Sequence, residues 1–134
     1  MYHGRGGLES GQAMNGGVYI AVFRMPRTRW IRVGARGRFR FERGVYLYVG
    51  TAQRGLDARI ERHGRKDKPL RWHVDYLSAE AEMVGAVCVP APRHRECEIA
   101  RELAGRYVRC VPGFGASDCR CGGHLFYAES WADL

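Results

Sequence analysis

Apolar residues cluster in short runs along the first half of the chain, and these runs predict strands. The stretch from Gly17 to Phe23 is rich in β-branched and aromatic residues, which is typical of a buried strand. Further short strands are predicted at 30–33, 38–42 and 45–49, with turns at the glycines between them. Phenylalanine and arginine alternate strictly in 38–42, so they lie on opposite faces. The chain is therefore predicted to open as an antiparallel meander.

The spacing of apolar residues becomes helical after residue 55. Leu56 and Ile60 are four residues apart, which predicts a helix over 56–65. The later pattern predicts, in order, a short helix over 70–77, a strand over 83–89, a helix over 95–107, a loop over 111–121 and a closing edge strand over 125–128. The fold class expected from this order is α/β (α+β), with a small central antiparallel sheet flanked by helices.

The length of 134 residues fits one compact domain. We expect residues 16–134 to form that domain and the glycine-rich, polar stretch 1–15 to be a disordered tail. The sequence has no run of about 18 apolar residues and no secretory signal pattern. We therefore expect a cytoplasmic protein that has no membrane partner.

The charge of the chain is strongly basic and unevenly distributed. The formal net charge is +8, and 20 of the 22 basic residues are arginine. Residues 24–71 contain 15 basic and four acidic side chains. This bias favours a polyanionic partner, because arginine binds phosphate through a planar fork of donors; an ordinary solvated surface is the alternative. The candidate nucleic-acid-binding residues are Arg36, Arg38, Arg40, Arg54, Arg62, Arg65, Lys66 and Arg71.

Four side chains in or after the meander are candidates for phosphate chemistry. Arg59 and His63 lie one helical turn apart, and we expect both to face outward into a cleft, where they could bind a phosphate. Tyr19 and Tyr48 lie in the first and last strands of the meander, which can pair side by side. The alternatives are a basic helix surface for the first two residues and ordinary packing for the tyrosines.

Two candidate metal sites lie in the second half of the chain. Glu96 begins the predicted helix over 95–107 and could bind a hard divalent cation, although first-turn acids are common without one. Cys119, Cys121 and His124 could bind zinc. Their Cys-x-Cys spacing is not that of a standard zinc knuckle and there is no second pair, so we expect reduced thiols rather than a zinc site.

The ordered combination of these residues resembles the GIY-YIG nuclease superfamily. Gly17-Val18-Tyr19 and Tyr48-Val49-Gly50 resemble its two signature tripeptides, and Arg59-Ile-Glu-Arg-His63 resembles the helix that follows the second. Glu96 resembles the helix-borne metal-binding glutamate, and fits better than the nearby Glu98 and Glu102. The tyrosines are 29 residues apart, which is longer than usual in the superfamily, and a hairpin fills this gap.

A closer resemblance is to a small uncharacterised subfamily that occurs alone or fused to endonuclease III-type glycosylases. The segments that carry it are 71–77, the dipeptide Glu96-Cys97, and 113–121 followed by His124-Leu-Phe126. The resemblance covers residues 16–128. Trp72, His73, Asp75 and the segment 113–121 have no role that the superfamily assigns.

The resemblance implies a GIY-YIG nuclease-like fold and a metal-dependent DNA endonuclease of repair or processing. Glu96 would bind one Mg²⁺ or Mn²⁺, and Arg59 would stabilise the charge that develops on the phosphorane. Tyr19 would deprotonate or orient the attacking water. Tyr48 and His63 would hydrogen-bond Tyr19 or the phosphate, with His63 as an alternative base.

The partner implied is DNA, with RNA left open, and a DNA glycosylase or another repair protein could bind as well. The rival interpretations are a non-catalytic nucleic-acid-binding module and a partner domain for a repair enzyme. Either would keep the fold without turnover.

Overall fold

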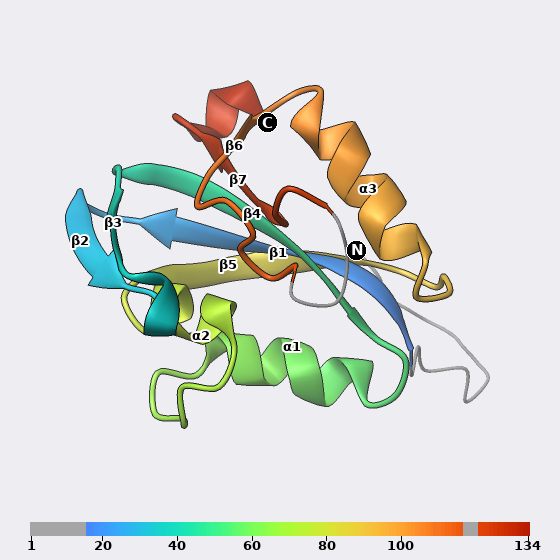
Figure 1. The fold of residues 1–134 in the computed structure, drawn as a ribbon. Coiled ribbons are helices and arrows are strands. Elements are labelled where there is room, and N and C mark those ends of the chain that lie inside the picture. Colours follow the sequence, from blue (N-terminus) through green and yellow to red (C-terminus); the bar gives the residue numbers. More distant parts are fainter. Residues whose placement is uncertain (1–15, 117–120) are drawn as a thin grey trace.

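The computed structural model describes residues 16–116 and 121–134. Five strands form one antiparallel sheet in the order β5–β1–β4–β7–β6 (Figure 1). In chain order the strands are β1 (Gly17–Met25), β4 (Gly44–Ala52), β5 (Glu82–Val89), β6 (Val108–Arg109) and β7 (Leu125–Ala128). The flanking helices are α1 (Leu56–Gly64), α2 (His73–Ser78) and α3 (Arg95–Ala104). The predicted small antiparallel sheet flanked by helices is confirmed, and the tail predicted at 1–15 lies outside the described residues.

The internal strand β1 divides its side chains between two hydrophobic cores, one on each face of the sheet. Tyr19 and Phe23 point into a core that includes Leu56 of α1 and Leu77 of α2. Val18 points to the opposite face, where α3 packs. Figure 1 shows α1 and α2 on one side of the sheet and α3 on the other. Strand residues alternate between faces, so a strand that is buried on both sides reads as a continuous apolar run.

The hairpin between β1 and β4 forms a sheet of its own, so the predicted antiparallel meander is wrong, although its first and last strands do pair side by side. Strands β2 (Arg29–Arg32) and β3 (Arg38–Phe41) pair only with each other, and the short 3₁₀ helix η2 (Gly34–Arg36) joins them. Strand β1 is instead flanked by β4 and β5 over most of its length. Both edges of β1 are therefore occupied. The hairpin covers the core with its apolar side, and its exposed arginines are Arg32, Arg36, Arg38 and Arg40.

The end of the chain also differs from the prediction. Strand β7 is not an edge strand, because the two-residue strand β6 pairs with its outer side. Helix α3 ends at Ala104 rather than at residue 107, which leaves room for β6 to form. A two-residue strand carries no periodicity of its own, so the pattern of the sequence could not reveal it. The 3₁₀ helix η3 (Trp131–Asp133) follows β7.

No helix in the described ranges has the length and apolar content that crossing a bilayer requires.

A buried ion pair joins α1 to α2. Asp75 is fully buried, and its two oxygens accept hydrogen bonds from Arg62 Nη1 and Nη2 at 2.7 and 3.0 Å. The backbone N–H groups of Arg71 and Trp72 also donate to Asp75 Oδ2. Burial alone would raise the pKa of Asp75, but the hydrogen bonds from Arg62 and from these backbone groups lower it. Arg62, a candidate nucleic-acid contact, is thus held inside the fold.

Replacing this carboxylate is expected to destabilise the domain. In an Asp75→Asn variant the Arg62 guanidinium would stay largely buried without its counter-ion, which costs on the order of 3 kcal/mol. Urea unfolding followed by circular dichroism measures the change, with the exposed Asp67→Asn as the matched control. Equal stability of the two variants would show that the pair does not brace the helices.

Candidate active site

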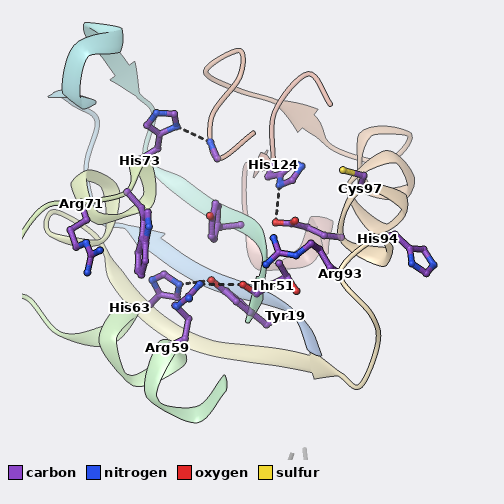
Figure 2. Close-up of a pocket in the computed structure, with 14 residues that line it drawn as sticks. Tyr19, Thr51, Arg59, His63, Arg71, His73, Arg93, His94, Cys97 and His124 are labelled. Atoms are coloured by element: carbon purple, nitrogen blue, oxygen red, sulfur yellow. Dashed lines mark hydrogen bonds and ion pairs between the residues drawn. The ribbon is translucent and has the colours of Figure 1, made fainter. Parts of the chain in front are cut away.

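One pocket brings together the five side chains that the sequence singled out for catalysis. The cavity has a volume of about 480 Å³ (Figure 2). Its lining includes all five of the predicted residues, Tyr19, Tyr48, Arg59, His63 and Glu96. They come from β1, β4, α1 and α3, so the convergence is produced by the tertiary fold.

The pocket lies beside the part of β4 that β7 does not pair with. Strand β7 pairs with β4 only over Val45–Tyr48, and the backbone of His124 makes the last hydrogen bond, to Val49. In the described part of the chain, no strand pairs with this edge of β4 beyond that point. The first turn of α3, which packs on the opposite face from α1, can therefore reach the pocket. This explains how Glu96 shares a cavity with residues of α1.

Tyr19 and His63 form a short buried hydrogen bond. Tyr19 Oη lies 2.6 Å from His63 Nε2. Burial raises the pKa of Tyr19 to about 12, although the Arg59 guanidinium partly opposes this. Burial also lowers the pKa of His63 to about 4, and the nearby Lys68 adds to the effect. Both groups are thus neutral at pH 7, so the phenol donates its proton to the imidazole nitrogen.

His63 lines the pocket from the packing face of α1 rather than from an outward one. Its exposed fraction is 1%, the same as that of Leu56 seven residues earlier. Seven residues are almost two helical turns, so the two side chains share a face. The expected outward orientation would have left the imidazole hydrated, whereas its burial is what lowers its pKa.

Each tyrosine of the pocket packs closely against a glycine. Gly50 is directly opposite Tyr19 in the β1–β4 pairing, and a Cβ at Gly50 would lie 2.5 Å from the Tyr19 hydroxyl. Gly115 has φ +69°, and a Cβ there would lie 2.8 Å from the Tyr48 ring. Gly115 also donates its backbone N–H to His73 Nδ1 at 2.8 Å. Both glycines are therefore needed for the tyrosines to occupy these positions.

Tyr48 packs against the rings of Tyr19 and His63 in the pocket. Its ring centroid lies 6.3 Å from that of Tyr19 and 5.9 Å from that of His63. Burial raises the pKa of Tyr48 well above its usual value, and the neighbouring Tyr19 adds to this. Tyr48 is thus a neutral phenol that supports Tyr19 by packing.

Trp72 packs against three arginine side chains at the pocket. The guanidinium carbon of Arg59 lies 4.5 Å from the Trp72 ring centroid, and those of Arg62 and Arg71 lie at 4.4 and 5.6 Å. Arg59 also donates to the carbonyl oxygen of Thr51 at 3.2 Å. Cation–π contacts of this kind hold a guanidinium in place without neutralising its charge. Trp72 had no role from its sequence position, because only the fold brings Arg59 and Arg62 of α1 against its ring.

Glu96 faces the pocket from the first turn of α3. Its Oε2 lies 3.3 Å from His124 Nδ1, and the dashed line that begins at His124 in Figure 2 marks this contact. Glu98 instead forms an ion pair with Arg95, so the structure favours Glu96 as the pocket carboxylate. Of the described residues that line the cavity, Glu96 alone carries a carboxylate. One carboxylate combined with phosphate oxygens is a common way to hold Mg²⁺, so the residues fit a single divalent ion.

The cysteine and histidine set differs from the predicted one. Cys119 lies outside the described residues, whereas Cys121 and His124 meet Cys97 of α3, with ligand atoms within 4.8 Å of one another. Sequence reasoning missed Cys97 as a member of this group. Its position directly after Glu96 in a motif dipeptide was the one signal that could have included it.

The predicted nucleic-acid-binding residues separate into three groups. Arg71 lines the pocket, together with Arg93 and His94, which the sequence did not single out. The charged ends of Arg62 and Lys66 are hydrogen-bonded to groups of the fold. Lys66 is exposed, and its ammonium donates to the carbonyls of Ser78 and Ala81. The remaining ones, exposed at the surface outside the pocket, are Arg36, Arg38, Arg40, Arg54 and Arg65, of which Arg36 donates to the Pro112 carbonyl and Arg40 pairs with Glu42.

A methyl group at Gly50 should displace Tyr19. We expect Gly50→Ala to lower the free energy of unfolding by about 1–3 kcal/mol, the usual cost of overpacking, and to lengthen the Tyr19–His63 hydrogen bond. Urea unfolding measures the first effect, and the NMR shifts of the His63 ring nitrogens report the second. Gly85→Ala in β5 is the control, because a Cβ there contacts nothing within 4 Å. Unchanged His63 shifts in Gly50→Ala would contradict this close packing.

The buried histidine should make the fold acid-sensitive. The pKa of His63 is about 4 in the folded chain and about 6.5 when unfolded, so between these values the unfolded state binds more protons. Stability therefore falls as the pH drops from 7 to 5, by about 2 kcal/mol from this residue alone. Urea unfolding at both pH values should show this loss in the wild type and in an exposed His94→Gln control, but not in His63→Gln. An equal loss in all three proteins would show that His63 is not the cause.

Comparison with known proteins places the chain in a family. The search of curated proteins and the search of solved structures gave no match. A family model described as "Domain of unknown function DUF123" matches residues 18–134, a range that contains every residue of the pocket. Because the match spans most of the sequence, the chain belongs to this family of unknown function.

Proposed function

We propose that the protein is a metal-dependent endonuclease that hydrolyses phosphodiester bonds in DNA. One observation supports this above all: the hydrogen-bonded Tyr19–His63 pair shares a single pocket with Arg59 and Glu96. This set offers a proton carrier, a cation for the phosphate and a carboxylate for a divalent ion. The resemblance of these residues to the GIY-YIG nucleases points to the same chemistry, and we infer a role in DNA repair or processing in the cytoplasm.

The charge of the pocket suits a phosphodiester. Three guanidinium groups line it, those of Arg59, Arg71 and Arg93. Guanidinium groups bind phosphate oxygens through paired N–H donors. Arg59 is held by Trp72 and Thr51, so it can stabilise the charge that develops on phosphorus without first becoming ordered. A bound phosphodiester would thus meet a preorganised cation.

The tyrosine and histidine pair can move a proton away from an attacking water. The Tyr19 oxygen donates its own proton to His63 Nε2 and keeps lone pairs with which to accept one. As the water oxygen attacks phosphorus, its proton can pass to Tyr19 while the phenolic proton passes to His63. His63 Nε2 is already engaged by Tyr19, so we favour Tyr19 as the group that contacts the water, with His63 as the final proton acceptor.

Glu96 would hold one Mg²⁺ or Mn²⁺, which would neutralise charge near the leaving oxygen. The Glu96 carboxylate is 17% exposed, and one of its oxygens contacts His124. A carboxylate has about four lone-pair sites, so this contact leaves room for an ion.

The exposed arginines outside the pocket can follow the phosphate backbone. Arg38 and Arg40 alternate on β3 with the half-buried Phe39 and the buried Phe41, so both arginines face solvent. Contacts of this type depend strongly on salt and carry little sequence information. We propose DNA as the partner on these grounds, and RNA is the natural comparison substrate.

Removing the cation or the carboxylate should abolish cleavage. Arg59→Ala and Glu96→Gln are each expected to slow cutting by at least about 100-fold, because each removes a charge that stabilises the transition state. The assay uses labelled single-stranded, duplex and branched DNA, and RNA, with Mn²⁺ or with EDTA. Arg101→Ala and Glu98→Gln are the matched controls on α3, and both should cut at the wild-type rate.

Several outcomes would contradict this proposal. Cutting by Glu96→Gln at the wild-type rate would remove the metal role of Glu96. A salt-sensitive mobility shift with no products under any condition would support a non-catalytic nucleic-acid-binding module. Capture of a DNA glycosylase without affinity for nucleic acid would support a repair-partner domain.

A further inference from the structure

Three groups that prefer transition metals meet at one end of the pocket, and the proposed cleavage uses none of them. The Sγ atoms of Cys97 and Cys121 and a ring nitrogen of His124 all lie within 4.8 Å of one another. His124 is 1% exposed, and the two cysteines are half-buried. Cys97 belongs to α3, while Cys121 and His124 come from the segment before β7. The fold therefore brings together ligands that are far apart in the sequence.

The spacing of these atoms is close to what a tetrahedral ion requires. Zinc binds thiolate sulfur at about 2.3 Å and imidazole nitrogen at about 2.0–2.1 Å, so its ligand atoms lie about 3.5–3.8 Å apart. The observed upper bound of 4.8 Å is about 1 Å wider. A small change in the χ1 angles of the two cysteines can close such a gap, because their side chains are short and half-buried.

His124 is already oriented as metal-binding histidines commonly are. Glu96 Oε2 lies 3.3 Å from Nδ1 of the ring, so Nε2 would be the nitrogen that binds the metal. Ligating histidines usually place their second nitrogen against a carboxylate or carbonyl in this way. The backbone of His124 is fixed as well, because its N–H donates to the Phe114 carbonyl and its carbonyl accepts from Val49. The backbone that carries the ring is therefore held in place directly before the start of β7.

We propose that Cys97, Cys121 and His124 bind a zinc ion, with a water molecule as the fourth ligand. Two thiolates and one imidazole favour zinc over the hard cations Mg²⁺ and Mn²⁺. The ion ties the first turn of α3 to the segment before β7, and this link fixes the helix turn that carries Glu96. The site is separate from the divalent ion of the proposed nuclease reaction, and its role is to position Glu96.

Metal binding can be tested without reference to activity. The zinc content of the full-length protein is measured by mass spectrometry after dialysis, and Co²⁺ is titrated into the metal-free protein while the thiolate-to-cobalt absorption is followed. We expect one zinc per chain and a saturable cobalt band. Cys97→Ser and Cys121→Ser should each weaken Co²⁺ binding at least 10-fold. Cys88→Ser and Cys110→Ser, which lie outside the group, should bind like the wild type.

Two further results separate this site from the nuclease proposal. Arg59→Ala should lose cleavage and keep its zinc, so the two proposals can fail independently. The wild-type cobalt titration needs no variant, and the absence of a thiolate band there would overturn the zinc site even if a cysteine variant failed to fold. Cobalt binding by Cys97→Ser that equals that of the wild type would also overturn it.

Discussion

The pairing of β1 with β4, with Tyr19 opposite Gly50, is the constraint on which the candidate site depends. Directly paired residues of antiparallel strands share a face, so this register turns Tyr19 toward α1 and places its ring over a residue without a side chain. A slip of one residue would turn Tyr19 to the α3 face, away from His63. The hydrophobic run of β1 enforces the register, because both faces of the strand are buried in separate cores.

The second constraint is the short reach of β7. Sheets that carry helices on both faces normally separate the two helical layers, and α1 and α3 lie on opposite sides here (Figure 1). Strand β7 begins at Leu125, which pairs with Tyr48, so it leaves the edge of β4 beside Thr51 uncovered. The first turn of α3 can therefore approach residues of α1. The pocket is therefore the place where both layers contribute side chains. This accounts for the position of Arg59 from α1 in the same pocket as the carboxylate of Glu96, the thiol of Cys97 and the imidazole of His124.

The sequence predicted the parts of the site that local patterns encode, and missed those that only tertiary contacts create. Tyr19, Tyr48, Arg59, His63 and Glu96 stood out because short motifs and helical spacing mark them, and all five line the pocket. The burial of Arg62 could not be read from the sequence, because it results from Asp75 reaching back from the next helix. Cys97 and the separate β2–β3 sheet were missed for the same reason, since long-range packing determines both.

In the proposed reaction, the final proton acceptor is a histidine with a low pKa, and the electrostatics of the pocket bear on this role. Burial and the cations Lys68 and Arg59 disfavour a charge on His63, so the imidazole is neutral and ready to accept a proton. Of these two cations Arg59 also lines the pocket, where it would attract a phosphodiester whose negative charge would then offset it. Binding of such an anion would raise the pKa of His63 toward its usual value at the moment when a proton must be accepted. In the proposed reaction, the charge of Arg59 would thus link proton acceptance by His63 to occupancy of the pocket.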